Sequence, residues 1–436
     1  MADTGLRARC LQHRRWRIGA AILLVLAITA GAASAALSPR GFHDGRLRPS
    51  NGQPDDRFGE SLAISGRTLV VAAPGHGQAG AAYVFRRPRR GDWEEARQKA
   101  QLTPSDAVNG FGASVAISGK AIVVGNPFDG AHGSAYLFEK PARGWRNATQ
   151  TAKLTPADTN AFLFGQSVAI SGQSAIVGAT WSTVNGHAMQ GSAYAFVRPA
   201  DGWTDMNETA RMYAGAGSEN DFFGRSVAIT GDTVVVGAPG RNVAGNTPNR
   251  GAAYVFVAPS GPNTWANTGT PTATLIASEG AEGDFLGFAV DISGPTIVAG
   301  AMQDDFGSSL TQGSAYVFER PQGGWTDVIE STKLAASDGA PADRLGFSVA
   351  IAGKAIVLGT GSHDVNGAVD QGAAYLYLKP ASGWTSPAPR PESRELITAD
   401  GGADDHFGVS VDITSDAIAA GAPGDRQGSA YAVTRP

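Results

Sequence analysis

Cysteine is almost absent from this sequence of 436 residues, where the single one is Cys10, near the start. A chain with one thiol cannot form an internal disulfide, so packing must hold its fold together. Charge is sparse as well, because charged residues make up 17% of the chain and the formal net charge is −4. No long run of one sign occurs. We therefore expect no nucleic-acid partner, since such proteins carry a basic patch for the phosphates.

Signatures of catalysis and of helical architecture are also missing. The sequence has no Gly-x-Ser-x-Gly, no His-Glu-x-x-His and no Gly-rich phosphate loop. No apolar period of 3.6 residues runs through it, which argues against a helical solenoid. Glycine is abundant, in contrast, with 58 residues, nearly twice the usual share of about 7%. This excess predicts many tight turns between short strands.

The first 35 residues differ from the rest of the chain. Five arginines precede an apolar stretch at 18–26, and small residues then lead to Ala33-Ser34-Ala35. This order predicts a secretory signal peptide over residues 1–35, followed by a short linker at 36–44. The protein would then be secreted, periplasmic or at the cell surface, without stable membrane insertion. An uncleaved membrane anchor stays open, because residues 18–37 are just long enough to span a bilayer.

The most informative pattern is the tetrapeptide Gly-(Ala/Ser)-Ala-Tyr, which recurs along the chain. Its seven copies occupy residues 80–83, 133–136, 191–194, 251–254, 313–316, 372–375 and 428–431. A Phe-Gly or Leu-Gly pair opens each repeat. The seven pairs are Phe58-Gly59, Phe111-Gly112, Phe164-Gly165, Phe223-Gly224, Leu286-Gly287, Leu345-Gly346 and Phe407-Gly408.

Between these markers lie short β-branched runs bounded by Gly, Pro, Ser or Asn, which is typical of strands. Each repeat contains four such runs, and the opening glycines are about 53 to 63 residues apart. That length suits one four-stranded antiparallel blade of a β-propeller. The sequence therefore predicts an all-β, seven-bladed propeller over residues 45–436.

The two ends of the repeated region predict how the ring closes. Residues 47–51 (LRPSN) match residues 102–106 (LTPSD), which form the last strand of a repeat. The final repeat, opened by Phe407-Gly408, has only three strands before the sequence ends. We therefore expect the N-terminal strand to complete the last blade, which would leave no open sheet edge.

These residues resemble FG-GAP repeats, the units of the integrin α-subunit propeller and of many secreted bacterial proteins. Phe223-Gly224 with residues 237–239 (GAP) matches both halves of the name in one repeat, and Phe407-Gly408 with residues 421–423 (GAP) does so again. Repeats three, five and six lack the proline. The resemblance covers residues 45–436 and implies an extracellular adhesion or interaction module that is not an enzyme.

One departure concerns calcium, which many members of this family bind in an Asp-x-Asp-x-Asp-Gly loop between the first two strands. Here that connection is a tight turn, such as Ser65-Gly66 or Ser171-Gly172. A two-residue turn cannot supply the six to eight oxygen ligands that calcium takes. The chain is most similar to the calcium-free bacterial members, and we expect no metal site and no cofactor.

The variable loops predict which face binds a partner. The connections between second and third strands lie on the same face as the blade-to-blade connections, and four of them are long, at 180–190, 240–250, 303–312 and 361–371. Loops on a rigid frame commonly carry function, although neutral variation in loop length is the alternative. The candidate partner-binding residues are Trp181, Asn185, Arg241, Asp304, Asp305, Phe306, His363, Asp364 and Asp370.

Trp181 is the most specific of these candidates, because it alone departs from the tryptophan pattern of the repeat. An exposed aromatic side chain there could anchor a partner or stack on a sugar. Phe128 and Phe306 occupy equivalent loops. The six tryptophans expected to serve packing precede a strand at the same place in six repeats, at 93, 145, 203, 265, 325 and 384.

Histidines and aspartates of the loops have simpler interpretations. Five histidines fall in loops of this face, at 76, 132, 187, 363 and 406, and among them His363 has an adjacent carboxylate in Asp364. We expect solvent-exposed histidines rather than metal ligands. An aspartate also recurs just before the opening pair, at 56, 221, 284, 343 and 405. Because a catalytic pair would occur once, we expect these aspartates to bond to turn amides.

The leading hypothesis is a secreted, monomeric, non-enzymatic module that presents a loop-rich face to a protein or a cell-surface glycan. The alternative is a carbohydrate-active or hydrolytic enzyme with its site at the mouth of the propeller channel, because blade scaffolds also host enzymes. Its candidate residues would be Asp304, Asp305, His363, Asp364 and Asp370. A purely structural envelope module is a third possibility.

Overall fold

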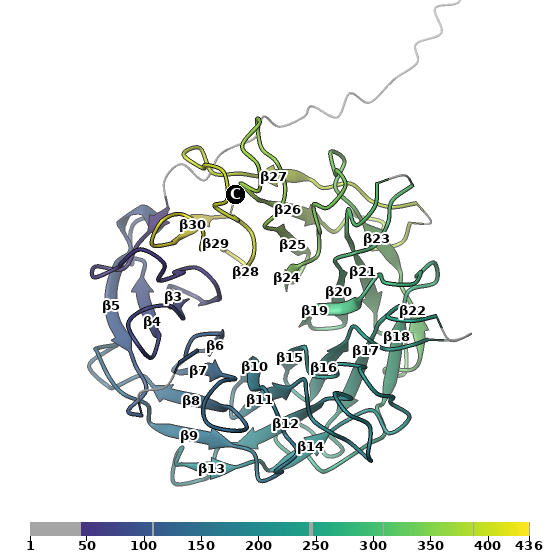
Figure 1. Cartoon of the computed structure of the whole chain (residues 1–436), viewed down its shortest axis with the longest axis horizontal. Helices are drawn as coiled ribbons and strands as arrows, with labels where there is room; N and C mark the ends of the chain where they lie inside the picture. The colour runs from purple at the N-terminus through teal and green to yellow at the C-terminus, as the bar shows by residue number, and fades with distance from the viewer. Residues whose placement is uncertain (1–44, 107–108, 244–246, 308, 387, 436) are drawn as a thin grey trace, which may run out of the picture. The chain divides into compact units, whose positions relative to one another are not determined.

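The computed structural model describes residues 45–435 except 107–108, 244–246, 308 and 387. All of these belong to one compact unit, residues 39–436. The predicted signal peptide (1–35) and linker (36–44) lie outside the described residues. Seven separate β-sheets form a ring, with β6, β10, β15, β19, β24 and β28 nearest its centre (Figure 1). The predicted seven-bladed propeller is therefore confirmed.

Each blade has four strands that follow one another outward from the centre of the ring. The first, inner strands are β2 (Leu62–Ser65), β6 (Ser114–Ser118), β10 (Phe164–Ser171), β15 (Ser226–Thr230), β19 (Leu286–Ser293), β24 (Ser348–Ala352) and β28 (Val411–Ile413). The second strands are β3 (Thr68–Ala73), β7 (Ala121–Asn126), β11 (Ser174–Ala179), β16 (Thr233–Ala238), β20 (Thr296–Ala301), β25 (Ala355–Thr360) and β29 (Ala417–Ala422).

The outer half of each blade carries the tetrapeptide. The third strands are β4 (Ala81–Arg86), β8 (Ser134–Glu139), β12 (Ser192–Val197), β17 (Ala252–Val257), β21 (Ser314–Glu319), β26 (Ala373–Leu378) and β30 (Ser429–Thr434). The fourth strands are β5 (Arg97–Leu102), β9 (Ala152–Thr155), β14 (Ala210–Met212), β18 (Ala273–Ile276), β23 (Thr332–Leu334), β27 (Arg394–Leu396) and β1 (Arg46–Leu47). The only helical element among the described residues is a short 3₁₀ turn, η1 (Trp93–Glu95).

The ring closes as the sequence predicts. Strand β1 is the fourth strand of the last blade, in the order β1-β30-β29-β28. It pairs antiparallel with β30, with Arg46 opposite Tyr431 and Leu47 opposite Ala430. The first and the last strand of the propeller, β1 and β30, therefore belong to the same sheet.

Two sheets have five strands instead of the expected four. In blade two, β13 (Met206–Asn207) pairs in parallel with β9, and in blade four, β22 (Val328–Ile329) pairs in parallel with β18. Each extra strand comes from the next blade, from the segment that leads into its fourth strand. The same contact is a single bridge elsewhere, such as Leu102 with Ala148. The outer edges of the blades are thus tied to their neighbours.

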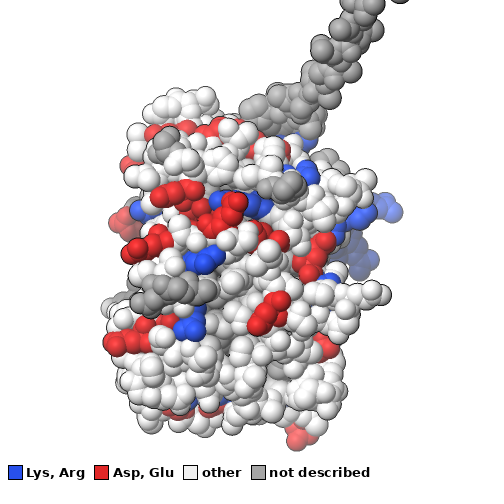
Figure 2. Space-filling model, turned by 90° about the vertical axis from the view of Figure 1, so that its right-hand side faces the viewer, with Lys and Arg blue, Asp and Glu red and all other residues white. Residues whose placement is uncertain are grey.

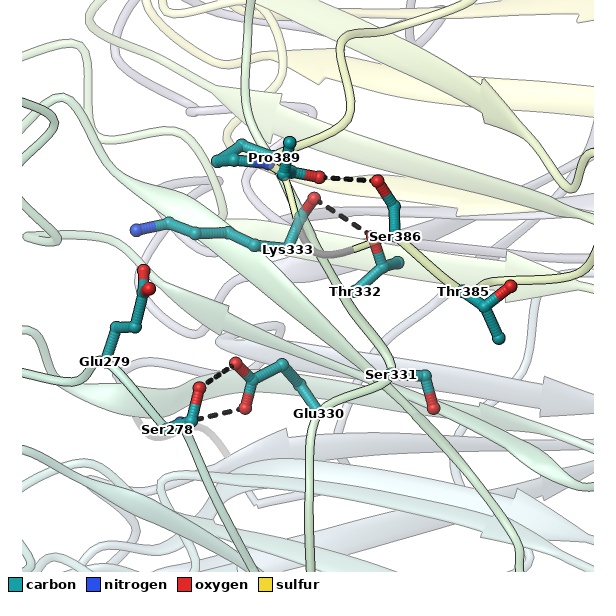
Figure 3. Close-up of a pocket in the computed structure, with 10 residues that line it drawn as sticks. Ser278, Glu279, Glu330, Ser331, Thr332, Lys333, Thr385, Ser386 and Pro389 are labelled. Atoms are coloured by element: carbon teal, nitrogen blue, oxygen red, sulfur yellow. Dashed lines mark hydrogen bonds between the residues drawn. The ribbon is translucent and has the colours of Figure 1, made fainter.

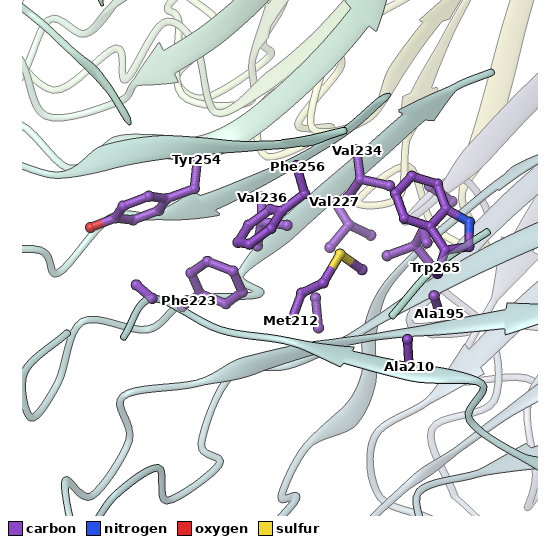
Figure 4. Close-up of a cluster of buried hydrophobic side chains, with 14 of the residues drawn as sticks. Ala195, Ala210, Met212, Phe223, Val227, Val234, Val236, Tyr254, Phe256 and Trp265 are labelled. Atoms are coloured by element: carbon purple, nitrogen blue, oxygen red, sulfur yellow. The ribbon is translucent and has the colours of Figure 1, made fainter. Parts of the chain in front are cut away.

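Apolar side chains fill the space between adjacent blades. Successive side chains of a strand point to opposite faces of its sheet, so each blade packs against the blade on either side. The cluster between blades three and four includes Phe223, Tyr254, Phe256 and Trp265, all buried (Figure 4). The six tryptophans of the repeat are buried, as expected for packing residues. The core is therefore a series of similar layers around the ring rather than one central cluster.

The repeated glycines are explained by close backbone contact between blades. Gly133, the first residue of a tetrapeptide, has a φ of +93°, and a Cβ added there would lie 2.1 Å from the carbonyl oxygen of Phe164 in the next blade. Gly165, of the opening pair, has a φ of +96°, and its Cβ would lie 2.4 Å from the carbonyl oxygen of Ser134. A side chain at either position would push two blades apart.

Candidate functional site

The two faces of the ring differ in the length of their connections. The first two strands of each blade are joined by two-residue turns; for example, Ser65 is paired with Thr68 and Ser171 with Ser174. The tight turns predicted from the sequence are thus present. The second-to-third and blade-to-blade connections lie on the opposite face, called the loop face below. All candidate residues from the sequence lie in connections of this face.

The recurrent aspartates hold the loops that enter five of the seven blades. Asp56, as the example, accepts a hydrogen bond from the backbone N–H of Gln53 at 2.7 Å. The equivalent acceptor and donor pairs are Asp221 with Ser218, Asp284 with Ala281, Asp343 with Ala340, and Asp405 with Gly402. The expected structural role of these five aspartates is confirmed.

Three exposed aromatic side chains gather on the loop face of blades two and three. Phe128 is 63% exposed, Trp181 50% and Phe162 39%. Together they define the aromatic patch, and they line a pocket of about 360 Å³ with Leu163 and Met189. Large exposed aromatic groups that share one concave surface are typical of an interaction site.

Backbone geometry explains why these three side chains meet. Phe128 and Trp181 occupy the same place in the repeat, three residues after Gly125 and Gly178. Phe162 belongs to the connection between the two blades, and its carbonyl oxygen accepts the backbone N–H of Trp181 at 3.2 Å. The sequence analysis identified Trp181 and Phe128 as candidates. It did not identify Phe162, because only the second-to-third loops were considered for exposed aromatic residues and Phe162 lies outside them.

Other candidate residues serve their own loops. Asn185 has a φ of +53° in the two-residue turn that joins Val184 to His187. Asp305 accepts the backbone N–H of Thr311 at 2.7 Å. Both residues thus have a role in the conformation of their own loops, and both are exposed.

The loop of blade six repeats this arrangement. Asp364 accepts the backbone N–H of Asp370 at 2.9 Å, and Asp370 itself has a φ of +52°.

In the loop of blade five, Phe306 is 40% exposed and Leu310 is 62% exposed. These two apolar side chains form a second, smaller exposed area on the loop face.

A polar cluster recurs beneath the second-to-third loops, around the tyrosine of several tetrapeptides. In blade two, the Tyr136 hydroxyl donates to Asp129 at 2.8 Å and to Asp106 at 3.0 Å. Lys153 forms ion pairs with both carboxylates and its Nζ lies 5.2 Å from the centre of the tyrosine ring. The cluster of blade two thus joins a tyrosine, two carboxylates and a cation.

Similar clusters in other blades explain two of the candidates. In blade five, Asp304 accepts the hydroxyl of Tyr316 at 2.7 Å and pairs with Lys333 at 2.7 Å. In blade four, Arg241 lies 3.3 Å from Asp221. Asp304 and Arg241 therefore have partners within the fold. Sequence reasoning did not detect these clusters, because their members come from three separate segments.

His363 has a different carboxylate partner from the one suggested by the sequence. Its Nδ1 lies 3.0 Å from Asp343, whereas the adjacent Asp364 bonds to a loop amide. His363 is also buried, so the expectation of a solvent-exposed histidine was wrong. Burial opposes a charged ring, but Asp343, with the charges of Asp338 and Glu395, raises the pKa of His363 above its ordinary value.

The pocket at the inner wall of the ring bears on the enzyme alternative. It has a volume of about 510 Å³ and is lined by Glu60, Phe347 and Val409, which lie just before three inner strands, and by His406. Glu60 is bound to Arg57 at 2.6 Å. None of the five residues proposed for catalysis lines this pocket.

Another pocket, of about 430 Å³, lies at the outer edge of blades four to six. Figure 3 shows Glu330 with its carboxylate turned to Ser278, whose N–H and hydroxyl it accepts at 2.8 and 2.6 Å. Glu392 and Ser337 repeat this contact in the next blade. The carboxylate of this pocket thus belongs to a link between blades.

Charge is mixed on the side of the ring seen in Figure 2. Figure 2 shows the side of the ring that carries β18, β22 and β23, with acidic and basic side chains interspersed. That distribution agrees with the expectation of no nucleic-acid partner. Within the part of the chain that the structure describes, no helix is long and apolar enough to cross a membrane.

Comparison with known proteins gives the family. No curated protein matches the chain. The FG-GAP repeat, a family whose members are typically non-catalytic interaction modules, matches seven segments, each of which runs from the fourth strand of one blade to the third strand of the next. They are residues 43–85, 96–138, 148–196, 206–256, 270–318, 328–377 and 392–434. With seven matched repeats in seven propeller blades, the chain belongs to the FG-GAP repeat family, and its propeller is of the integrin α type.

Proposed function

We propose that this protein is a secreted, non-enzymatic adhesion module that binds a protein partner through the aromatic patch of Phe128, Phe162 and Trp181. The exposure of these three side chains around one pocket is the observation that supports the proposal. Buried aromatic anchors dominate the binding energy of many protein interfaces. The predicted signal peptide supports an extracellular place of action.

The chemistry of the pocket favours a protein over a glycan. Apart from the Thr183 hydroxyl, the side chains that line it are apolar. Sugar recognition needs several polar groups beside the aromatic ring, because each buried hydroxyl must keep a hydrogen bond. An apolar side chain of a protein partner, in contrast, needs only the enclosed apolar surface. The partner should therefore present an exposed Leu, Met, Phe or Trp to this patch.

A capture experiment with matched baits tests the proposal. The wild-type chain, the variant Phe128→Ala/Trp181→Ala and the control Phe306→Ala/Leu310→Ala are immobilised and exposed to surface extracts of the cells that make the protein. The control removes two exposed apolar side chains of another loop on the same face. Retained proteins are identified by mass spectrometry, purified, and their affinity for each bait is measured by surface plasmon resonance.

We expect the Phe128→Ala/Trp181→Ala variant to bind the partner at least about 30-fold more weakly, which corresponds to about 2 kcal/mol. The control should bind like the wild type. A partner that binds all three baits equally would refute the role of the patch. If the retained material is a glycan lost on deglycosylation, the protein partner is wrong.

A further inference from the structure

Blade six departs from the polar cluster of blades two, three, five and seven. In blades two, three, five and seven, the fourth strand places a Lys or Arg beside the tyrosine, and that cation pairs with carboxylates of the cluster. The four cations are Lys153, Arg211, Lys333 and Arg46. In blade six the residue opposite Tyr375 is Glu395. A carboxylate therefore stands where these four blades have a positive charge.

The rest of this cluster is acidic as well. Asp338 accepts the hydroxyl of Tyr375 at 3.0 Å, as Asp106 accepts that of Tyr136 in blade two. Among the described residues, neither Asp338 nor Glu395 has a Lys or Arg partner. Two carboxylates that face each other without a cation repel. The group that faces both is the buried ring of His363.

The geometry of His363 directs one nitrogen toward the two carboxylates. Its Nδ1 is bound to Asp343 at 3.0 Å, which leaves Nε2 facing the cluster, 3.9 Å from Asp338. The His363 side chain is only 9% exposed, and Nε2 has no hydrogen-bond partner among the described residues. A carboxylate on the far nitrogen is how proteins orient histidines that bind metals.

Blade one contains a neutral counterpart of this cluster. His76 occupies the place of His363, and its Nδ1 is bound to Asp56 at 2.8 Å. Its Nε2, however, lies 3.2 Å from the amide of Asn51, which also donates to Gln101 at 3.3 Å. Asn51 and Gln101 are the amide equivalents of Asp338 and Glu395. The amide satisfies the histidine in blade one, whereas a carboxylate cannot donate to an imidazole nitrogen.

We propose that His363 Nε2, Asp338 and Glu395 bind a divalent transition-metal ion, of which Zn²⁺ fits best. One imidazole and two carboxylates are ligands that zinc accepts, with water in the fourth position. The three ligand atoms lie within 4.8 Å of one another, against about 3.3 Å between ligands of a tetrahedral zinc site with bonds near 2.0 Å. The partly exposed carboxylate of Asp338 allows that contraction.

The ion would replace the cation that blades two, three, five and seven supply from the chain. It would link Asp338, which follows the last strand of blade five, to His363 and Glu395 of blade six. Ca²⁺ is the poorer fit, because it takes six to eight oxygen ligands and disfavours nitrogen. The site is separate from the aromatic patch, so it stands whether or not the proposed function holds. It replaces our expectation of no metal site from the sequence.

Titration with zinc chloride tests the site. The full chain is freed of metal with EDTA and titrated by isothermal calorimetry, in parallel with the variant Asp338→Asn/Glu395→Gln. This variant gives blade six the side chains of blade one and keeps the bond between His363 and Asp343. The matched control is His76→Gln, which alters the counterpart in blade one. Thermal denaturation in EDTA checks that all three proteins are folded.

We expect the wild type and the His76→Gln control to bind one equivalent of Zn²⁺ and to melt at a higher temperature with it. The Asp338→Asn/Glu395→Gln variant should bind at least tenfold more weakly. A second variant, Glu395→Lys, should lose zinc binding and melt at a higher temperature than the wild type in EDTA, because it restores the ion pair of the other blades. Equal zinc binding by wild type and Asp338→Asn/Glu395→Gln would overturn the proposal. So would binding of Ca²⁺ in preference to Zn²⁺.

Discussion

Single glycines set the distance between blades in this propeller. Gly251 opens the fourth tetrapeptide with a φ of +83°, and a Cβ there would lie 2.2 Å from the carbonyl oxygen of Leu286. Gly231 also has a positive φ, +58°, but lies in a hairpin turn where nothing is within 4 Å of the added Cβ. A side chain at Gly231 would therefore cause conformational strain alone, whereas a side chain at Gly251 would cause that strain and a steric clash with the next blade.

Alanine at each glycine should measure the two effects. Gly231→Ala should cost about 1 kcal/mol, the penalty for a left-handed conformation with a side chain. Gly251→Ala should cost about 3 kcal/mol or more, because the blades must also move apart. Urea denaturation of both variants gives the difference in the free energy of unfolding. Equal costs would mean that the close contact at Gly251 relaxes freely.

The residue roles that the sequence predicted correctly are those that the repeat itself displays. An aspartate precedes five of the seven opening pairs, and this recurrence alone argued for a turn bond. The sequence showed only the adjacent Asp364 beside His363, because Asp343 is 20 residues away and reaches the ring through the fold. Glu395 could have been found by aligning the fourth strands, where its charge is opposite to that of Lys153 and Lys333.

The inner strands are the elements in which neighbouring blades bind each other most directly. Most of them carry alanine near their centre, but β19 has Asp291 and β28 has Asp412. Asp291 accepts the backbone N–H of Ile351 in the next blade at 2.7 Å, and Asp412 accepts that of Ile64 at 2.7 Å. Burial raises the pKa of Asp291 to about 7 and that of Asp412 to about 6.

These shifts predict that stability falls as the pH rises. Between about pH 4 and 7 the folded protein retains the proton of Asp291, whereas the unfolded chain has lost it, so raising the pH favours unfolding. Asp291→Ala restores the residue of the other blades and should remove about 2 kcal/mol of the decrease in stability between pH 5 and 8. Urea denaturation at several pH values measures the free energy of unfolding.

The control is Asp305→Ala, at an exposed loop carboxylate, which should leave the dependence of that free energy on pH unchanged. If Asp291→Ala also leaves it unchanged, the assignment to Asp291 is wrong.

The sequence predicted the strands that pair with a neighbour in the same blade. It did not predict the strands that pair with a different blade. The inner two strands of each blade are joined by short turns, so β-branched runs and a glycine were enough to place them. The parallel pairs of β13 with β9 and of β22 with β18 were not predicted, because each joins a polar segment of one blade to the edge of another. Nothing in a segment such as Met206–Asn207 indicates that partner.

At the scale of the whole molecule, the ring closes between blades seven and one at two levels. At the inner wall, Asp412 accepts the N–H of Ile64, and the Ser410 hydroxyl donates to the carbonyl oxygen of Gly59 at 2.7 Å. At the outer edge, β1 covers β30 and buries Leu47. Arg46 of β1 also forms ion pairs with Asp400 and Asp425. The outer closure comes from a segment far from the rest of the blade in sequence.

Removing the outer closure should weaken the ring without unfolding it. A chain that begins at residue 52 lacks β1, so it exposes the edge of β30 and loses the buried Leu47 and the ion pairs of Arg46. A chain that begins at residue 45 keeps all of these and is the matched control. We expect the shorter chain to melt on the order of 5 °C lower, from the lost apolar burial and pairing. It should also associate, because an open strand edge is a template for another chain.

Differential scanning calorimetry measures the melting temperature, and size-exclusion chromatography measures the association. If both chains melt at the same temperature and stay monomeric, the inner contacts between β28 and β2 close the ring by themselves and β1 adds nothing.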